Sequence, residues 1–146
     1  MHLDELDRNL TVTIAYRDEH LIELQTNVVV GDWSASATAY TDRAALGEFA
    51  RQLAHFSTNL ANRVEFEAGD QSGTGYLFMA FYPVDSVGHL ACNLRLASKT
   101  ETIHRPEEVW RMSIEIQTEP GALDAFAAEL GRLAANGQGV ATLRLN

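Results

Sequence analysis

The sequence has few of the features that usually reveal a chemistry. Its single cysteine, Cys92, excludes an internal disulfide bond. Cys92 lies in phase with the leucines of segment 90–96, a position typical of a small core residue. A nucleophilic thiolate would need a neighbouring base and partial exposure, and the local sequence supplies no base. We therefore assign Cys92 to the core.

Long apolar runs are also missing. No stretch reaches the roughly 18 residues that a membrane-spanning helix requires. The acidic start, residues 1–7, lacks the basic and then apolar segments of a secretory signal. We expect a cytoplasmic protein that has no membrane partner.

Motifs for nucleophilic and phosphate chemistry are absent as well. No serine stands in a Gly-x-Ser-x-Gly sequence. The glycine-rich segment 69–75 precedes a strand pattern, whereas a phosphate-binding loop ends in Lys-Ser or Lys-Thr and opens a helix. The acidic residues show no pairing of the kind that acid–base catalysis uses. The sequence predicts no cofactor and favours a protein that is not an enzyme.

The histidines lack the spacing of a zinc site. Asp18, Glu19 and His20 share one turn, and Asp85 and His89 share another. If the two turns met, they would form a mixed carboxylate and imidazole site, and otherwise these are solvated turn residues. We predict no metal site. The five histidines are His2, His20, His55, His89 and His104.

The charge is strongly one-sided, with a formal net charge of −9. Such a surface repels nucleic acid and anionic lipid and attracts a basic protein. A high net charge also keeps a protein in solution without any partner. Both explanations stay open at this point.

A repeat is the most informative feature that is present. From Trp33 to Asn59, adding 77 to the residue number gives an identical residue at nine of 27 positions, without a gap. About one match in fifteen or twenty positions is expected by chance. The excess indicates a duplicated structural unit. The pairs are Trp33/Trp110, Ser36/Ser113, Thr41/Thr118, Ala45/Ala122, Leu46/Leu123, Phe49/Phe126, Ala50/Ala127, Leu53/Leu130 and Asn59/Asn136.

Hydrophobic periodicity supplies the elements of this unit. Alternation of apolar and polar residues predicts strands, and apolar residues three and four apart predict amphipathic helices. Thr41 or Asp42 suits the cap of the first helix, and Pro120 suits the first turn of the second. The expected strands are 10–16, 22–30, 33–40, 64–68, 76–82, 90–96, 110–117 and 141–145, and the helices end near 59–62 and 136–137.

Each half therefore has the order strand, strand, strand, helix, strand, over about 10–68 and 76–145. This order predicts one α+β domain over 1–146, with a mostly antiparallel sheet and two helices on one side, related by an approximate two-fold axis. Whether the sheet is continuous or curled stays open. The inward-facing alanines 35, 37 and 39 would allow a helix to pack closely. The halves differ at 69–75 and 97–107, and these segments are either loops specialised for a site or loops whose sequences have simply drifted.

Two surfaces are candidates for binding. Segment 76–82 is apolar on both faces, so we expect either self-association through Phe78 and Phe81, giving a homodimer, or cover from the same chain. Polar positions of the other strands would share the face opposite the helices, either as a solvated surface or as a docking surface for a basic protein. The glutamates of that candidate surface are Glu23, Glu65, Glu67 and Glu115.

Several stretches resemble a family of small uncharacterised bacterial proteins, some of which are described as immunity proteins of toxin systems. The resemblance rests on Trp33 with helix 41–53, on Gly75-Tyr76-Leu77, on Gly88-His89-Leu90 and on helix 123–130. It brings no catalytic residues, and it implies inhibition by binding. We therefore expect a non-enzymatic interaction protein, and the alternative is a small-molecule-binding protein or enzyme with a cleft between the repeats.

Overall fold

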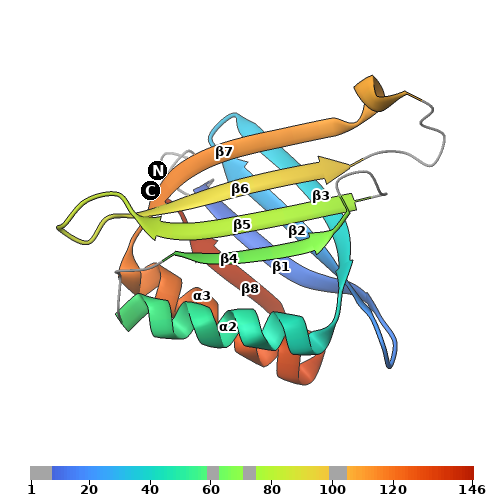
Figure 1. Cartoon of the computed structure of the whole chain (residues 1–146), viewed down its shortest axis with the longest axis horizontal. Coiled ribbons are helices and arrows are strands. Elements are labelled where there is room, and N and C mark those ends of the chain that lie inside the picture. Colours follow the sequence, from blue (N-terminus) through green and yellow to red (C-terminus); the bar gives the residue numbers. More distant parts are fainter. Residues whose placement is uncertain (1–7, 59–62, 71–74, 99–104) are drawn as a thin grey trace.

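The computed structural model describes residues 8–58, 63–70, 75–98 and 105–146, and the statements below concern those residues (Figure 1). The strands are β1 (Arg8–Arg17), β2 (Ile22–Val30), β3 (Trp33–Thr41), β4 (Val64–Gly69), β5 (Gly75–Pro83), β6 (Leu90–Ser98), β7 (Trp110–Thr118) and β8 (Val140–Arg144). The helices are α2 (Arg43–Thr58), α3 (Pro120–Asn136) and a short 3-10 turn, η1 (Pro106–Glu108). The predicted order of elements is confirmed in both halves.

The strands form two antiparallel sheets rather than one. We call the sheet with order β3-β2-β1-β8 sheet A and the sheet with order β4-β5-β6-β7 sheet B. Each sheet takes three strands from one half of the chain and its fourth strand from the other half. If the halves are exchanged, so that β1 replaces β5 and β4 replaces β8, the order of sheet A becomes that of sheet B. The strand order is thus the one that a two-fold axis between the halves requires.

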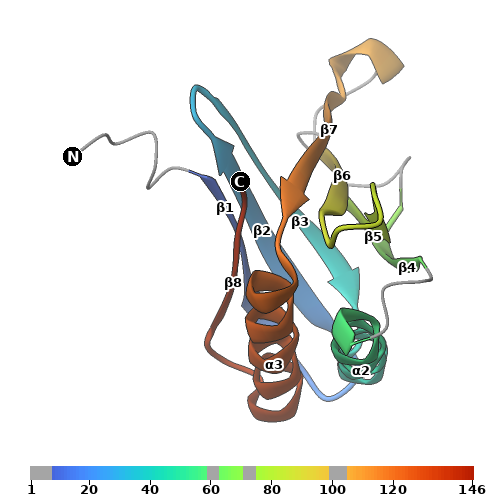
Figure 2. The same ribbon diagram turned by 90° about the vertical axis from the view of Figure 1, so that its left-hand side faces the viewer.

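The two sheets face each other, and the two helices lie side by side at one end of them (Figure 2). The helices approach closely because small residues meet at their contact. A Cβ atom added at Gly47 would lie 3.8 Å from the Cβ of Ala134, and one added at Gly131 would lie 4.0 Å from the Cβ of Ala50. The helices and the inner faces of the sheets enclose one core.

Repeat-equivalent residues occupy equivalent places in this core. Leu46 and Leu123 are fully buried, and so are Leu53 and Leu130. Phe49 stacks on Phe66 of β4 with ring centroids 4.7 Å apart, and its equivalent in α3 is also fully buried. The apolar stripe predicted for each helix therefore faces the core in both halves, where full burial of one such side chain contributes about 1.5–3 kcal/mol.

The ends of the helices are closed by specific contacts. The Asp42 carboxylate accepts a hydrogen bond from the backbone N–H of Ala45 at 2.7 Å, so Asp42 caps α2. At the end of α3, Gly137 adopts φ 73° and its N–H donates to the carbonyl of Leu133. Arg43 Nε donates to the carbonyl of Ala134 at 2.8 Å. These donors satisfy carbonyls that the helix itself leaves without partners.

The sequence predicted that the alanines of β3 allow a helix to pack closely, and the structure shows that a second sheet approaches them. β3 crosses the inner face of sheet B, next to β4, β5 and β6. A Cβ atom added at Gly69 would lie 3.1 Å from the Cβ of Ala39. The small side chains are needed because two sheets approach here, which the alternation within a single strand does not reveal.

Candidate functional site

The four predicted docking glutamates do not share one face. Glu65, Glu67 and Glu115 lie on the outer face of sheet B, because their inward neighbours in β4 and β7 face the core. Glu23 lies in β2 and therefore belongs to sheet A. The prediction of one shared face is wrong because the eight strands split into two sheets.

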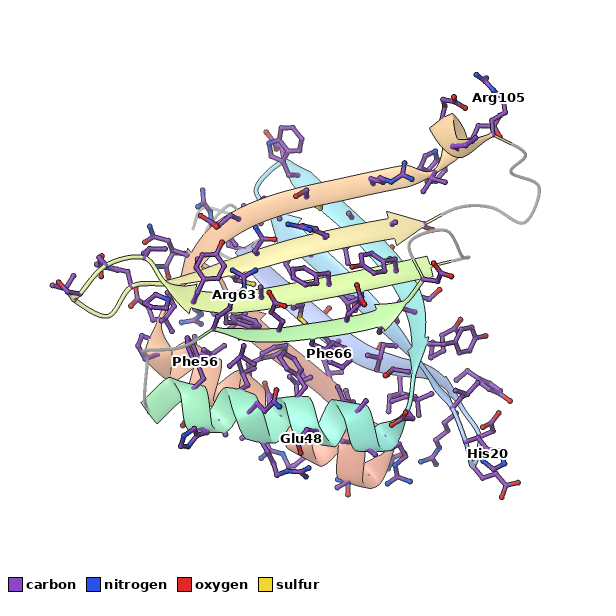
Figure 3. All side chains as sticks on the ribbon, viewed as in Figure 1. His20, Glu48, Phe56, Arg63, Phe66 and Arg105 are labelled. Atoms are coloured by element: carbon purple, nitrogen blue, oxygen red, sulfur yellow. The ribbon has the colours of Figure 1, made fainter. Side chains whose placement is uncertain are left out.

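The outer face of sheet B is also not uniformly acidic. The guanidinium of Arg63, which Figure 3 places on this side of β4, lies 2.5 Å from the Glu65 carboxylate and 4.7 Å from the ring centroid of Tyr82. Tyr76 donates a hydrogen bond to Glu67 at 2.5 Å, and Tyr82 donates one to Glu115. The three carboxylates are thus already engaged by neighbours in the same chain.

The apolar strand β5 is covered by the chain itself on one face. Phe81 is fully buried in the core and offers no surface to a second copy. Phe78 lies on the opposite, outer face, half-buried, with the Arg95 guanidinium 5.0 Å from its ring centroid. Of the two residues predicted for self-association, only Phe78 therefore remains at a surface.

The two turns that carry His20 and His89 lie at opposite ends of the molecule (Figures 1 and 3). The mixed carboxylate and imidazole site does not form. In the second turn, His89 Nδ1 lies 2.6 Å from an Asp85 oxygen, and this contact raises the pKa of His89 and lowers the pKa of Asp85. Within the described part of the chain, no three His, Cys, Asp or Glu residues gather as a metal site would need, while His2 and His104 lie outside that part.

Cys92 is fully buried among the core residues, and burial raises the pKa of its thiol far above the ordinary value. Its position fits the predicted structural role. Most of the two loops where the halves differ falls outside the described residues, because residues 71–74 and 99–104 are not among them.

An open groove of about 660 Å³ lies between the first half of β3 and the first half of β7, over the end of β6. Leu96, Met112 and Ile114 give it an apolar wall, and Arg111 is the one charged residue among the described residues of its lining. The lining contains Trp33, Ser34, Ala35, Ser36, Leu96, Ala97, Ser98, Trp110, Arg111, Met112, Ser113 and Ile114.

The groove carries both tryptophans of the chain, Trp33 and Trp110. They begin β3 and β7 and are 71% and 72% exposed. Strand alternation assigns both to the inward-facing set, but the two strands begin far from the helices, where the sheets diverge (Figure 2). Ser36 and Ser113, another repeat-equivalent pair, also line the groove. The duplication thus places matching side chains in both β3 and β7.

Packing does not explain why both halves keep these tryptophans, since burial is what usually retains a large aromatic residue in a fold. An exposed aromatic pair at an apolar groove is instead typical of an interaction site. The first pair of the repeat, Trp33/Trp110, was the sequence signal for this site. The inward parity of both residues predicted burial, so the pattern of the strands did not indicate an exposed site.

The described lining of the groove offers apolar surface, four serine hydroxyl groups and one guanidinium group. Its described lining has no histidine, cysteine, aspartate or glutamate, and so no side chain suited to act as a general base near neutral pH.

None of the described helices combines the length and apolar character needed to cross a membrane. Comparison of the chain with protein-family models, with curated proteins and with solved structures finds no match.

Proposed function

We propose that this protein is a non-enzymatic binding protein whose groove holds an apolar segment of a basic partner protein. The observation that carries the proposal is the pair of repeat-equivalent, exposed tryptophans on the two walls of one apolar groove. Neutralisation of the partner by occupation of its surface is the role that the resemblance to immunity proteins implies.

The energetics of the groove support this function. Removing a large apolar side chain from water contributes about 2–3 kcal/mol, and Trp is enriched among the residues that dominate interface energies. Two tryptophans next to Met112 and Ile114 therefore supply a strong contact over a small area. The four hydroxyl groups in the lining can hydrogen-bond a partner's backbone without imposing a charge.

The charge of the molecule supports a basic partner. The net charge of −9 raises the association rate of a basic protein through long-range attraction. In this proposal Glu23, Glu65, Glu67 and Glu115 contribute to that attraction from a distance, and the groove makes the contact that determines affinity.

A second candidate is a small apolar molecule in the same groove. The volume of about 660 Å³ falls within the roughly 300–1,000 Å³ of small-molecule sites. The groove also lies between the two repeats, where the alternative function would place its cleft. Its open shape and its position between two strands favour the protein partner.

Affinity capture from the source cell, with three forms of the full chain, tests the proposal. The forms are the natural chain, Trp33→Ser/Trp110→Ser, and Tyr40→Ser, which removes another exposed aromatic of β3 that does not line the groove. We expect the natural chain and Tyr40→Ser to capture a basic protein. The double variant should bind that protein at least about tenfold more weakly.

The eluates are also examined for small molecules. A protein partner retained by the double variant would contradict the groove as the binding site. An apolar molecule of a few hundred daltons, lost from the double variant in the absence of any protein, would favour the second candidate.

A further inference from the structure

We propose, on the basis of the proposed function, that the partner binds as an extended segment that adds a strand to the free edge of β7. In this arrangement alternate side chains of the segment enter the groove beside Trp110, Met112 and Ile114, and the others remain on the outer face. The inference names the form of the bound segment, which the groove alone does not specify.

The first observation is the direction in which the backbone groups of β7 point. The N–H of Asn146 donates to the carbonyl of Gln117 at 2.9 Å, so the carbonyl of Gln117 points away from β6. Residues of an antiparallel strand direct their backbone groups to alternate sides. Since the register of β6 and β7 is regular from Trp110 to Thr118, the N–H and C=O groups of Arg111, Ser113 and Glu115 also point away from β6.

The second step is that, among the described residues, only the end of this edge is occupied, where Asn146 bonds the carbonyl of Gln117, and the part from Arg111 to Glu115 is open. Among the described strands, β6 is the only one paired with β7. Natural edge strands are usually protected by charged side chains, by proline, by a bulge or by being short. The charged residues of β7 are Arg111 and Glu115, and the Glu115 carboxylate already accepts a hydrogen bond from Tyr82. β7 has nine residues, no proline and no break in register. An edge of this kind is a template for strand addition.

The groove supplies the third step, which is side-chain recognition. Arg111 and Ser113 on the free edge belong to the same lining as Met112, Ile114 and Trp33. A strand hydrogen-bonded to the edge therefore places every second side chain against the apolar wall. β3 is less suitable for addition, because its Thr38 carbonyl faces Gly75 so closely that a Cβ there would lie 1.7 Å from the oxygen. The net charge of −9 favours a segment that carries basic residues.

The test begins with selection of binders from a displayed library of random twelve-residue peptides. We expect the enriched peptides to alternate apolar and polar residues, to carry basic residues, and to depend on Trp33 and Trp110. Hydrogen exchange followed by NMR then reports the contact. Amides of Ser113 and Glu115 should gain protection when a selected peptide binds, whereas those of Met112 and Ile114 are already protected by β6.

Variants at Ser113 separate backbone from side-chain effects. Ser113→Pro removes an outward N–H that β6 does not use and should weaken peptide binding about tenfold or more. Ser113→Ala keeps the N–H and loses only the hydroxyl group, so it should weaken binding clearly less than Ser113→Pro does. Thermal unfolding shows whether Ser113→Pro is folded. If this variant is unfolded, the exchange measurement on the natural chain still tests strand addition.

The outcomes separate this inference from the proposed function. Tryptophan-dependent peptides that leave the amides of Ser113 and Glu115 unprotected would overturn strand addition and leave the groove as the binding site. Failure to enrich any tryptophan-dependent peptide would overturn the inference, while affinity capture still tests the function. A third outcome is that these amides are protected in the free protein, and that both their protection and the dimer mass measured by light scattering rise with concentration. This result would overturn the inference, because a second copy of the chain would then occupy the edge.

Discussion

At the scale of single residues, Gly75 marks the place where β3 crosses sheet B. A Cβ atom added at Gly75 would lie 1.7 Å from the carbonyl oxygen of Thr38 and 2.9 Å from its carbonyl carbon. Both atoms belong to the backbone of β3, so they cannot move aside as a flexible side chain would. The segment 69–75, where the sequences of the two halves differ, thus ends in a glycine that the approach of two sheets requires.

We expect Gly75→Ala to lower the free energy of unfolding by about 2–3 kcal/mol, because the added methyl group forces the sheets apart. Gly121→Ala is the matched control, since nothing lies within 4 Å of an added Cβ there. It sits in the first turn of α3 and should be neutral or stabilise by up to about 1 kcal/mol. Urea unfolding measures both, and equal effects would contradict the proposed crossing.

At the scale of elements, the two helices are equivalent parts of one core. Leu46 in α2 and Leu123 in α3 are 77 positions apart, and both are fully buried. The spacing of apolar residues three and four positions apart was enough to predict the apolar stripe of each helix, because a helix of this kind buries one face against any packing partner. Spacing did not predict that α2 and α3 pack on each other through Gly47 and Gly131, since small residues fit several kinds of close contact.

We expect Leu46→Ala and Leu123→Ala each to cost about 2–5 kcal/mol in the free energy of unfolding, with values that differ by no more than about 1 kcal/mol. The control is Arg132→Ala on the exposed side of α3, which should change stability by less than about 0.5 kcal/mol. Denaturant unfolding gives the three values. A large cost in one helix and none in the other would argue against equivalent surroundings.

At the scale of the whole molecule, the sequence predicted the elements and the duplication but not the exchange between the halves. Alternation determines which side of a strand is buried, and it does not determine which strand lies next to it. β4 therefore gave no sign that it pairs with β5 of the other half, and β8 gave none that it pairs with β1. For the same reason, the sequence did not show that Glu23 lies in a different sheet from Glu65 and Glu115.

The binding groove has a related origin. Trp33 and Trp110 have the parity of core residues, but parity guarantees burial only where another layer lies opposite. The two sheets lie close together at the end that carries the helices and diverge at the other end (Figure 2). The first residues of β3 and β7 are therefore left uncovered. The site thus arises from the angle between whole sheets, which no local pattern encodes, while the repeat identified its residues.

Intrinsic fluorescence of the tryptophans tests the central claim most directly, because the two tryptophans of the chain both line the groove. The single-tryptophan variants Trp33→Phe and Trp110→Phe are titrated with the captured partner, and acrylamide quenching is measured before and after. We expect emission from each remaining tryptophan to shift to shorter wavelength and to become protected from the quencher. Unchanged emission and quenching of both tryptophans while the partner binds would contradict the account.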